Sequence, residues 1–337
     1  MKLVIPMAGF GSRMRPHTWT RPKPLLPLAG KPMLAHVLDL FKDLPIEEYI
    51  FIIGWLGEQV KEYVSDNYKI PSHFVEQREL LGQAHALWLA HQHMQGPLFT
   101  FFVDTLFFDA DFGDLGKPGI DGIVFTKEVN DPRPFGAAEV DAEGHVVKLI
   151  EKPTALDNKK VMMGLYYFQD GGSLAEACEE LMVRGRQIRG EYFESDAVNV
   201  LIEHGAVFET REVGRWLDTG RPDTTLHANR FLLDHGHDNS RRVQARRTVI
   251  IPPVHVAPDA VVEDAIIGPY ADIGSGAHVH NAIIRNSIVD ANASVEDIVL
   301  EGSLIGEKSQ IKGQPQRLNI GDSSTAGFEY LVDESWL

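Results

Sequence analysis

The chain has 337 residues, of which 44% are hydrophobic and 24% are charged, and its formal net charge is -16. This composition is typical of a globular protein that buries a sizeable core. The acidic balance argues against a nucleic-acid polymer as the main partner, because binding to a phosphate backbone depends on Lys and Arg. The length favours two domains.

A single cysteine, Cys178, excludes an intrachain disulfide and is typical of a reducing compartment. The sequence has no run of about 18 apolar residues, so we expect neither a membrane span nor a membrane partner. We therefore predict a cytoplasmic protein.

Along the first part of the chain, strand-like and helix-like patterns alternate. Short apolar runs predict strands, and longer amphipathic stretches predict helices. A hairpin follows, with the turn sequence Asp141-Ala142-Glu143-Gly144. Alternation predicts an α/β sheet, and the hairpin makes it a mixed sheet. The expected strands are 3–5, 49–53, 99–103 and 122–125, the expected helices are 33–42 and 82–94, and the hairpin is 137–151.

Composition changes after about residue 231. Residues 234–240 are polar and four arginines follow them. This pattern favours a solvated linker at 231–248, or an interdomain salt-bridge site, over a site for an acidic partner. From Ile250 onward, aliphatic residues recur mostly every six residues. This period predicts a parallel β-helix over 249–312, because each side of a coil supplies one inward aliphatic residue. The array resembles left-handed hexapeptide-repeat domains, and 313–337 form a polar tail.

The strongest chemical signal lies at the N-terminus. A glycine-rich turn follows the first expected strand, and glycine lets backbone N–H groups approach a phosphate closely. Arg13 and Lys23 add fixed cationic donors. Two common alternatives fail, because Met14 occupies the third glycine position of a dinucleotide fingerprint and no Gly-Lys-Ser/Thr completes a Walker A loop. The expected phosphate-binding residues are Ala8, Gly9, Gly11, Ser12, Arg13 and Lys23.

The turn Gly9-Phe10-Gly11-Ser12-Arg13 and the later Lys23-Pro24 resemble the signature of the sugar nucleotidylyltransferase family. That signature is a glycine turn with Ser/Thr-Arg, followed later in the chain by Lys-Pro. Other matches follow in the order of that family. The resemblance implies that Gln77 and Gly82 contact the base, and that Asp104 and Asp218 bind Mg²⁺. Two carboxylates with phosphate oxygens and water make an oxygen-rich set that suits this ion. At the first aspartate the usual Gly-Asp of the family is Val103-Asp104.

A second group of matches lies at and after the hairpin. The resemblance implies that Gly136, Glu151, Lys152 and Gly164 bind the sugar phosphate. Residues 189–192 and Asp196 resemble a further family stretch, although an ordinary helix cap explains them equally well. The histidine pairs 91/93 and 278/280 lack the spacing of a zinc site, so no zinc is expected.

The resemblance implies a Rossmann-like three-layer catalytic domain over residues 1–230. Its expected reaction is Mg²⁺-dependent attack of a sugar-1-phosphate on an NTP, giving an NDP-sugar and pyrophosphate. Arg13 would stabilise the leaving pyrophosphate, Lys23 the α-phosphate and Lys152 the incoming phosphate. The overall plan is most similar to glucose-1-phosphate thymidylyl- or uridylyltransferases, which implies dTTP or UTP and glucose-1-phosphate.

Three alternatives remain open at this point. The chain could be a mannose-1-phosphate guanylyltransferase, or a non-catalytic regulatory paralogue that binds a nucleotide sugar. The repeat domain could also transfer an acyl group with His255, His278 or His280, although a structural role in a homo-oligomer is the simpler interpretation.

Overall fold

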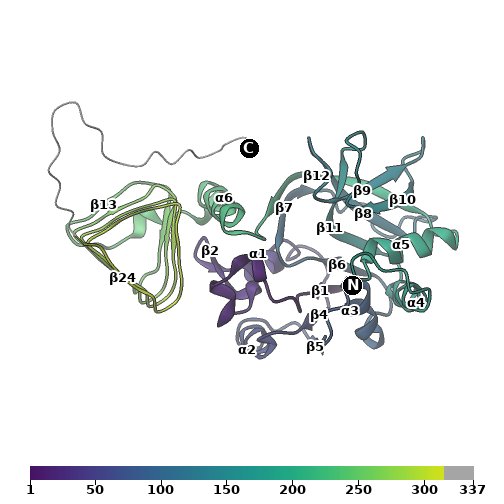
Figure 1. The fold of residues 1–337 in the computed structure, drawn as a ribbon, viewed down its shortest axis with the longest axis horizontal. Coiled ribbons are helices and arrows are strands. Elements are labelled where there is room, and N and C mark those ends of the chain that lie inside the picture. Colours follow the sequence, from purple (N-terminus) through teal and green to yellow (C-terminus); the bar gives the residue numbers. More distant parts are fainter. Residues whose placement is uncertain (315–337) are drawn as a thin grey trace.

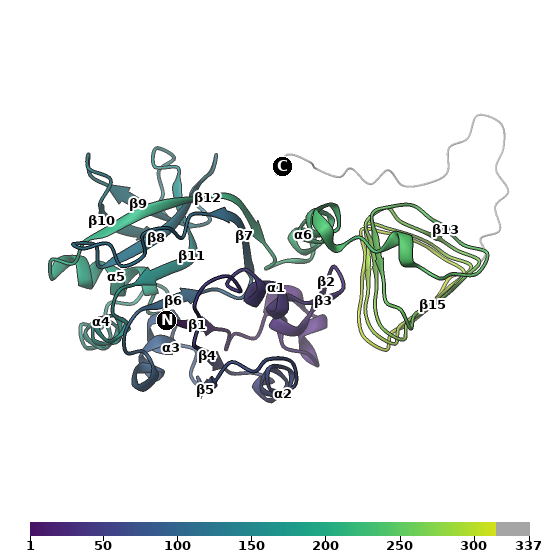
Figure 2. The same ribbon diagram turned by 180° about the vertical axis from the view of Figure 1, so that it is seen from behind.

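The structure is a computed structural model that describes residues 1–314, so most of the expected tail lies outside the described residues. The described part has two bodies: an α/β body from β1 to α6, and a β-helix of triangular coils (Figures 1 and 2). Both views show α6 between them. The predicted fold class is confirmed.

A mixed sheet of ten strands forms the centre of the α/β body, with the order β5-β4-β1-β6-β11-β8-β12-β7 and the hairpin β9/β10 beside β11. The first four of these strands are parallel, whereas β11 is antiparallel to β6 and β8. The strands are β1 (Lys2–Pro6), β4 (Glu48–Ile53), β5 (Ser72–Glu76), β6 (Leu98–Phe101), β7 (Thr105–Ala110), β8 (Gly122–Glu128), β9 (Gly136–Val140), β10 (Val146–Glu151), β11 (Lys160–Phe168) and β12 (Phe208–Asp218).

Helices cover both faces of the sheet, which makes three layers. One buried cluster joins the sheet to α1, α2 and α6, and a second joins it to α3, α4 and α5. The helices are α1 (Met33–Asp39), α2 (Gly57–Asn67), α3 (Gln83–Leu89), α4 (Gly171–Val183), α5 (Glu194–Glu203) and α6 (Pro222–Leu232). The expected helix over 82–94 is interrupted at Ala90, where ψ is 5°, and continues only as a 3-10 turn, η4 (His91–His93).

The β-helix consists of three parallel four-stranded sheets stacked around a core of small aliphatic residues. Inward residues such as Ile267 and Ile284 are fully buried, as the six-residue period predicts. Its strands are β13 (Val249–Ile250), β14 (Val254–Val256), β15 (Val261–Glu263), β16 (Ile266–Ile267), β17 (Ala271–Ile273), β18 (His278–His280), β19 (Ile283–Arg285), β20 (Ile288–Val289), β21 (Ser294–Glu296), β22 (Val299–Glu301), β23 (Leu304–Ile305) and β24 (Gln310–Lys312).

The chain passes from one body to the other through α6, a π turn η5 (Leu233–His237) and a 3-10 turn η6 (Ser240–Arg242). The β14-β17-β20-β23 face of the β-helix contacts the α/β body. There, a two-stranded ribbon of β2 (Pro27–Leu28) and β3 (Lys31–Pro32) reaches the β-helix. Within residues 1–314, no helix has the length and apolarity needed to cross a membrane.

Candidate functional site

The carboxyl ends of β1, β4, β5 and β6 meet at one edge of the sheet, because these strands are parallel. Strand β12 ends at the same edge, since it is parallel to β8, and β8 and β6 are both antiparallel to β11. Open α/β sheets generally bind ligands at this edge. The topology therefore brings the glycine-rich turn, Gln77, Asp104 and Asp218 together from distant parts of the chain.

The glycine-rich turn leaves β1 and is closed by a 3-10 turn, η1 (Ser12–Met14). Gly11 has φ of +60°, and a Cβ there would lie 2.9 Å from the Thr18 Cγ2 atom. The Thr18 hydroxyl donates a hydrogen bond to the Gly11 carbonyl at 2.9 Å. Gly9 faces open space, because a Cβ there would have no atom within 4 Å. The turn is thus fixed at Gly11 and open to a ligand at Gly9 and Phe10.

Two cations converge on one carboxylate at the end of β6. Lys23 Nζ lies 2.7 Å from Asp104 Oδ2, and an Arg13 guanidinium nitrogen lies 3.8 Å from the same oxygen. Lys23 is held by η3 (Lys23–Leu25) and is only 8% exposed. Burial opposes ionisation of Asp104, but the Lys23 ammonium and then Arg13 outweigh it and lower the pKa of this carboxyl. Asp104 is therefore ionised at neutral pH.

Asp218 lies beside Asp104 because β12 and β7 are paired. Asp218 is the register partner of Thr105, and the Thr219 N–H donates to the Asp104 carbonyl at 2.9 Å. One Asp218 oxygen accepts from the Gly220 N–H at 3.0 Å. A Cβ at Gly220 would lie 3.1 Å from an Arg13 guanidinium nitrogen, so Arg13 reaches both aspartates' loops.

The two aspartates fit a hard divalent cation. The residues 1–314 contain no group of three or more His, Cys, Asp or Glu side chains placed to hold a metal. Mg²⁺ usually takes only one or two protein carboxylates and completes its shell with substrate phosphates and water. An ionised Asp104 next to Asp218 offers that kind of oxygen set.

Gln77 follows β5 and is buried, with 5% of its surface exposed. Its Nε2 donates to the Gly82 carbonyl at 3.0 Å and lies 3.0 Å from the His85 Nδ1 atom. The amide nitrogen is thus engaged, and its oxygen has no hydrogen-bond donor among the described residues. Gly82 has φ of +100°, and a Cβ there would lie 2.4 Å from the Tyr192 carbonyl oxygen, so no other residue fits.

The sugar-phosphate candidates form a second group at the same edge. The hairpin pairs Glu151 with Gly136, and β11 pairs Met162 with Gly136 and Leu165 with Phe101. The Gly164 carbonyl accepts from the Phe102 N–H at 3.1 Å, two residues before Asp104. The sheet register therefore places this group beside the aspartates.

Glu151 and Lys152 differ in their surroundings. Glu151 accepts a hydrogen bond from the Ser195 hydroxyl at 2.7 Å, and burial raises the pKa of its carboxyl. Lys152 is exposed, and its backbone is held at φ of +49° while its N–H donates to the Phe135 carbonyl at 2.9 Å. Within residues 1–314 its side chain has no carboxylate partner within 4 Å, so its charge is available to an anion.

Sequence reasoning did not single out Ser195 and Glu194, at the start of α5. Ser195 orients Glu151. Glu194 is 1% exposed and accepts a hydrogen bond from the Thr100 hydroxyl, and its other oxygen, Oε2, has no partner among residues 1–314. Burial raises the pKa of Glu194 to about 8. From the sequence, a glutamate at the start of a helix is expected to be exposed to solvent. The burial of Glu194 becomes visible only from the packing of α5 in the structure.

The segment before α5 supports the base candidates. The Tyr192 N–H donates to the Leu81 carbonyl at 2.8 Å, and its carbonyl accepts from the Ala84 N–H at 3.0 Å. Tyr192 therefore braces the backbone on both sides of Gly82. Asp196 lies in the first turn of α5, where burial raises the pKa of its carboxyl.

Comparisons with known proteins identify the family of the chain. A family model described as nucleotidyl transferase matches residues 2–235. A low-salt glycan biosynthesis nucleotidyltransferase of Haloferax volcanii is 30% identical, covering 96% of this chain and 99% of its own. A glucose-1-phosphate thymidylyltransferase of Streptomyces antibioticus is 29% identical, covering 92% and 93%.

A UTP–glucose-1-phosphate uridylyltransferase of Haloferax volcanii is 30% identical and covers 69% of this chain and 97% of its own. Among solved structures, a UDP-glucose pyrophosphorylase complexed with UDP-glucose has the same fold, with a TM-score of 0.60 and 19% identity. That match covers 69% of this chain and 98% of the other.

Proposed function

Because the chain belongs to the nucleotidyl transferase family and is a nucleotidyltransferase, we propose that it joins an NTP to a sugar-1-phosphate and releases pyrophosphate. The observation that carries this proposal is the convergence of Lys23 and Arg13 on Asp104, beside Asp218. The protein as a whole has a net charge of -16, so two cations held together at the ligand-binding edge of the sheet are not explained by its overall composition. The same edge carries Glu151 and Lys152, where the second substrate would bind.

The proposed reaction is in-line attack by a sugar-1-phosphate oxygen on the α-phosphorus of the NTP. A new P–O bond forms and the bond to pyrophosphate breaks, so no water is consumed. The attacking oxygen is already anionic and needs no strong general base. The main task of the protein is to hold two polyanions in line, and such positioning can contribute roughly 7–11 kcal/mol.

Each cation has a distinct role in this mechanism. Arg13 stabilises the leaving pyrophosphate, Lys23 the charge on the α-phosphate, and Lys152 the phosphate of the incoming sugar. The backbone of Ala8, Gly9, Gly11 and Ser12 cradles the triphosphate. Mg²⁺, held by Asp104 and Asp218, would neutralise phosphate charge when bound.

We propose dTTP or UTP as the nucleotide and glucose-1-phosphate as the sugar. Two relatives are named for these reactions. The buried Gln77 supports a pyrimidine, because its free amide oxygen can accept the N3–H of thymine or uracil. Guanine also carries an N–H on its base-pairing edge, which the Gln77 amide oxygen could accept. Mannose-1-phosphate guanylyltransfer is therefore the competing assignment.

The test is a matrix of dTTP, UTP, CTP, ATP and GTP against glucose-, mannose- and N-acetylglucosamine-1-phosphate, read by pyrophosphate release. The proposal expects the highest kcat/KM for dTTP or UTP with glucose-1-phosphate, and low activity with CTP, because cytosine has no N3–H for Gln77 to accept. A preference for GTP and mannose-1-phosphate would overturn it. Absence of pyrophosphate release with every pair would favour the non-catalytic alternative.

We further infer that residues 1–230 form the catalytic domain and that the β-helix (249–312), reached through the linker 231–248, assembles the protein into a homo-oligomer. One face of the β-helix carries an outward row of aliphatic residues, which we call the aliphatic ladder. Its two end members, Val249 and Val299, are 57% and 63% exposed. A row of like side chains is complementary to a second copy of itself, as a two-fold interface requires. The ladder consists of Val249, Ile266, Ile283 and Val299.

A further inference from the structure

The β-helix packs against the α/β body through buried apolar side chains of its β14-β17-β20-β23 face. Ile288 of β20 is 3% exposed and belongs to the same buried cluster as the sheet and α1. Tyr270, next to β17, and Leu304 of β23 pack against that cluster. The two bodies thus share an interface in which a polar contact is partly shielded from water.

Arg21 links this interface to the candidate active site. It lies in the segment that joins Arg13 to Lys23, the two cations beside the glycine-rich turn. One guanidinium nitrogen of Arg21 donates to Asp290 Oδ2 at 2.7 Å, and the other donates to Glu307 Oε2 at 2.6 Å. The β-helix therefore holds a side chain that lies between the two cations in the sequence.

The repeat of the β-helix fixes the two carboxylates. Asp290 follows β20 and Glu307 follows β23, and these two strands pair in register on successive coils. Asp290 is 7% exposed, and its other oxygen accepts from the Ala291 N–H at 2.6 Å. The Asp290 N–H donates to the Ile305 carbonyl at 2.9 Å. Arg21 is therefore anchored at a point that the stacked coils define.

The α/β body holds the backbone of the same segment, but it does not hold the Arg21 side chain. The Trp55 indole N–H donates to the Thr18 carbonyl at 3.3 Å, and Gln59 Nε2 donates to the Thr20 carbonyl at 2.9 Å. Among residues 1–314, the Arg21 side chain forms hydrogen bonds only with the β-helix. Its orientation therefore depends on that body.

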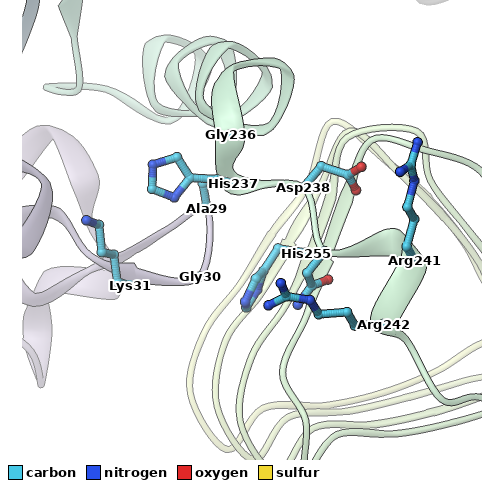
Figure 3. A pocket seen from close by; sticks show the side chains of 10 residues that line it. Ala29, Gly30, Lys31, Gly236, His237, Asp238, Arg241, Arg242 and His255 are labelled. Atoms are coloured by element: carbon cyan, nitrogen blue, oxygen red, sulfur yellow. The ribbon is translucent and has the colours of Figure 1, made fainter.

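A second anchor lies on the other side of Lys23 in the sequence. The turn 29–31 follows η3 and reaches β14, as Figure 3 shows for Gly30 and His255. The Gly30 N–H donates to Asp272 Oδ2 at 3.1 Å, and a Cβ at Gly30 would lie 2.5 Å from the His255 Nε2 atom. The β-helix thus contacts the chain both before and after Lys23.

The connection between Arg21 and Lys23 is short and stiff. Only Pro22 separates them, and Pro24 follows Lys23. The proline ring fixes φ, which is -67° at Pro22. Lys23 itself is 8% exposed, so its ammonium has little freedom to move independently of its backbone. A displacement of Arg21 is therefore transmitted to Lys23.

We propose that Asp290 and Glu307 are positioning residues for nucleotide binding, because through Arg21 they hold Lys23 and Arg13 where the triphosphate needs them. This inference rests on the proposed function, and it gives the β-helix a role besides assembly. Charge-assisted hydrogen bonds to two carboxylates are strong enough to fix a guanidinium. Cations that are already in place bind an anion more tightly, because no ordering cost remains.

The first test is calorimetry of the full chain with Mg²⁺-dTTP and with Mg²⁺-tripolyphosphate, which carries no base. We expect D290N/E307Q to bind each about tenfold more weakly than wild type. An asparagine oxygen can still accept the Ala291 N–H, so the coil should persist. Loss of two negative charges alone would strengthen the binding of an anion. Weaker binding therefore indicates lost positioning.

The matched control is E296Q/D297N, which removes the same two charges from another face of the β-helix. Glu296 and Asp297 pair with Lys312 at 2.9 and 3.7 Å, at the end of β21. The affinity of this variant should stay within about twofold of wild type.

A mutant cycle separates positioning by Arg21 from direct binding of phosphate by Arg21. R21Q should lose as much affinity as D290N/E307Q, and the triple variant should lose no more than either, because all three side chains act through one contact. A further loss in the triple variant would make Arg21 a phosphate ligand and would overturn the positioning role.

Steady-state kinetics supply a readout that a purely structural contact would not move. D290N/E307Q should raise the KM for the NTP and lower kcat, whereas the KM for the sugar-1-phosphate should stay within about twofold. A lower melting temperature with unchanged kinetic constants would overturn the proposal. Glu307 is 33% exposed, so E307Q should fold even where the double variant does not, and it should show an intermediate loss.

The binding assay also separates this inference from the proposed reaction. Equal or tighter binding of both ligands by D290N/E307Q would overturn the positioning role and leave the proposed function standing. A wild type that binds neither ligand would overturn the proposed function, and this inference with it.

Discussion

Substitution by asparagine would remove different interactions at Asp104 and at Asp218. Asp104 neutralises the nearly buried Lys23, so Asp104→Asn also leaves a cation without its partner. In the part of the chain that the structure describes, the Asp218 side chain accepts a hydrogen bond only from the Gly220 N–H, which an asparagine oxygen can still accept. Asp218→Asn is therefore the cleaner test of the metal role.

We expect Asp218→Asn to reduce Mg²⁺-dependent pyrophosphate release by about a hundredfold or more. Its circular dichroism and melting temperature should stay close to wild type. Asp104→Asn should lose as much activity and also some stability. The exposed Asp66 of α2 provides the control Asp66→Asn, which should keep full activity. Turnover by Asp218→Asn at the wild-type rate would contradict the assignment.

Glu194 makes the stability of the protein depend on pH. Its pKa is raised from an ordinary value of 4.5 to about 8, so between these values it is protonated when folded and ionised when unfolded. Unfolding then releases a proton, and stability falls as pH rises from 4.5 to 8, by at most about 1.4 kcal/mol per pH unit. Above pH 8 the effect is constant.

The substitution Glu194→Gln should remove this contribution, because glutamine stays neutral. The variant should therefore gain stability relative to wild type between pH 5.5 and 8.5, measured as the difference in urea midpoint. Glu176→Gln, at an exposed position of α4, should show no such gain. Parallel pH profiles for wild type and Glu194→Gln would show that Glu194 is ionised in the fold.

At the scale of elements, α6 connects the two bodies through one fully buried amide. Asn229 accepts from the Ala29 N–H at 2.9 Å and donates to the Tyr270 carbonyl at 3.3 Å. Asn229→Ala leaves both backbone groups without a partner, which should cost about 1–3 kcal/mol each. We expect a lower melting temperature by calorimetry, whereas Asn67→Ala at the exposed end of α2 should change little. An unchanged melting temperature would mean that water replaces the amide.

At the scale of the whole molecule, the aliphatic ladder predicts self-association. The double variant V249K/V299K places charges on the outward row without touching the core of the β-helix. We expect a smaller sedimentation mass than for wild type. Val261 is 43% exposed on the polar face of β15, so Val261→Lys is the matched control and should leave the mass unchanged. A monomeric wild type would remove the basis of this proposal.

The sequence predicts those features that depend on local periodicity. The six-residue period of the aliphatic residues predicts the β-helix, and alternating strands and helices predict the layered sheet. Arg13 and Lys23 lie within about 15 residues of the glycine turn, so the sequence also predicts a phosphate-binding segment there. The burial of Glu194 and the contact of Asp272 with Gly30 depend on packing between distant segments, which local patterns do not encode.

The ion pair between Lys23 and Asp104 has a consequence for how the nucleotide and the metal affect each other's binding. Without substrate, the ammonium occupies the carboxylate oxygen that a divalent cation needs. A triphosphate that attracts Lys23 frees this oxygen, and a bound cation likewise frees Lys23 for the phosphate. Each ligand thus removes the competitor of the other, and their affinities are linked by the same factor in both directions. Nucleotide and metal are therefore expected to bind cooperatively.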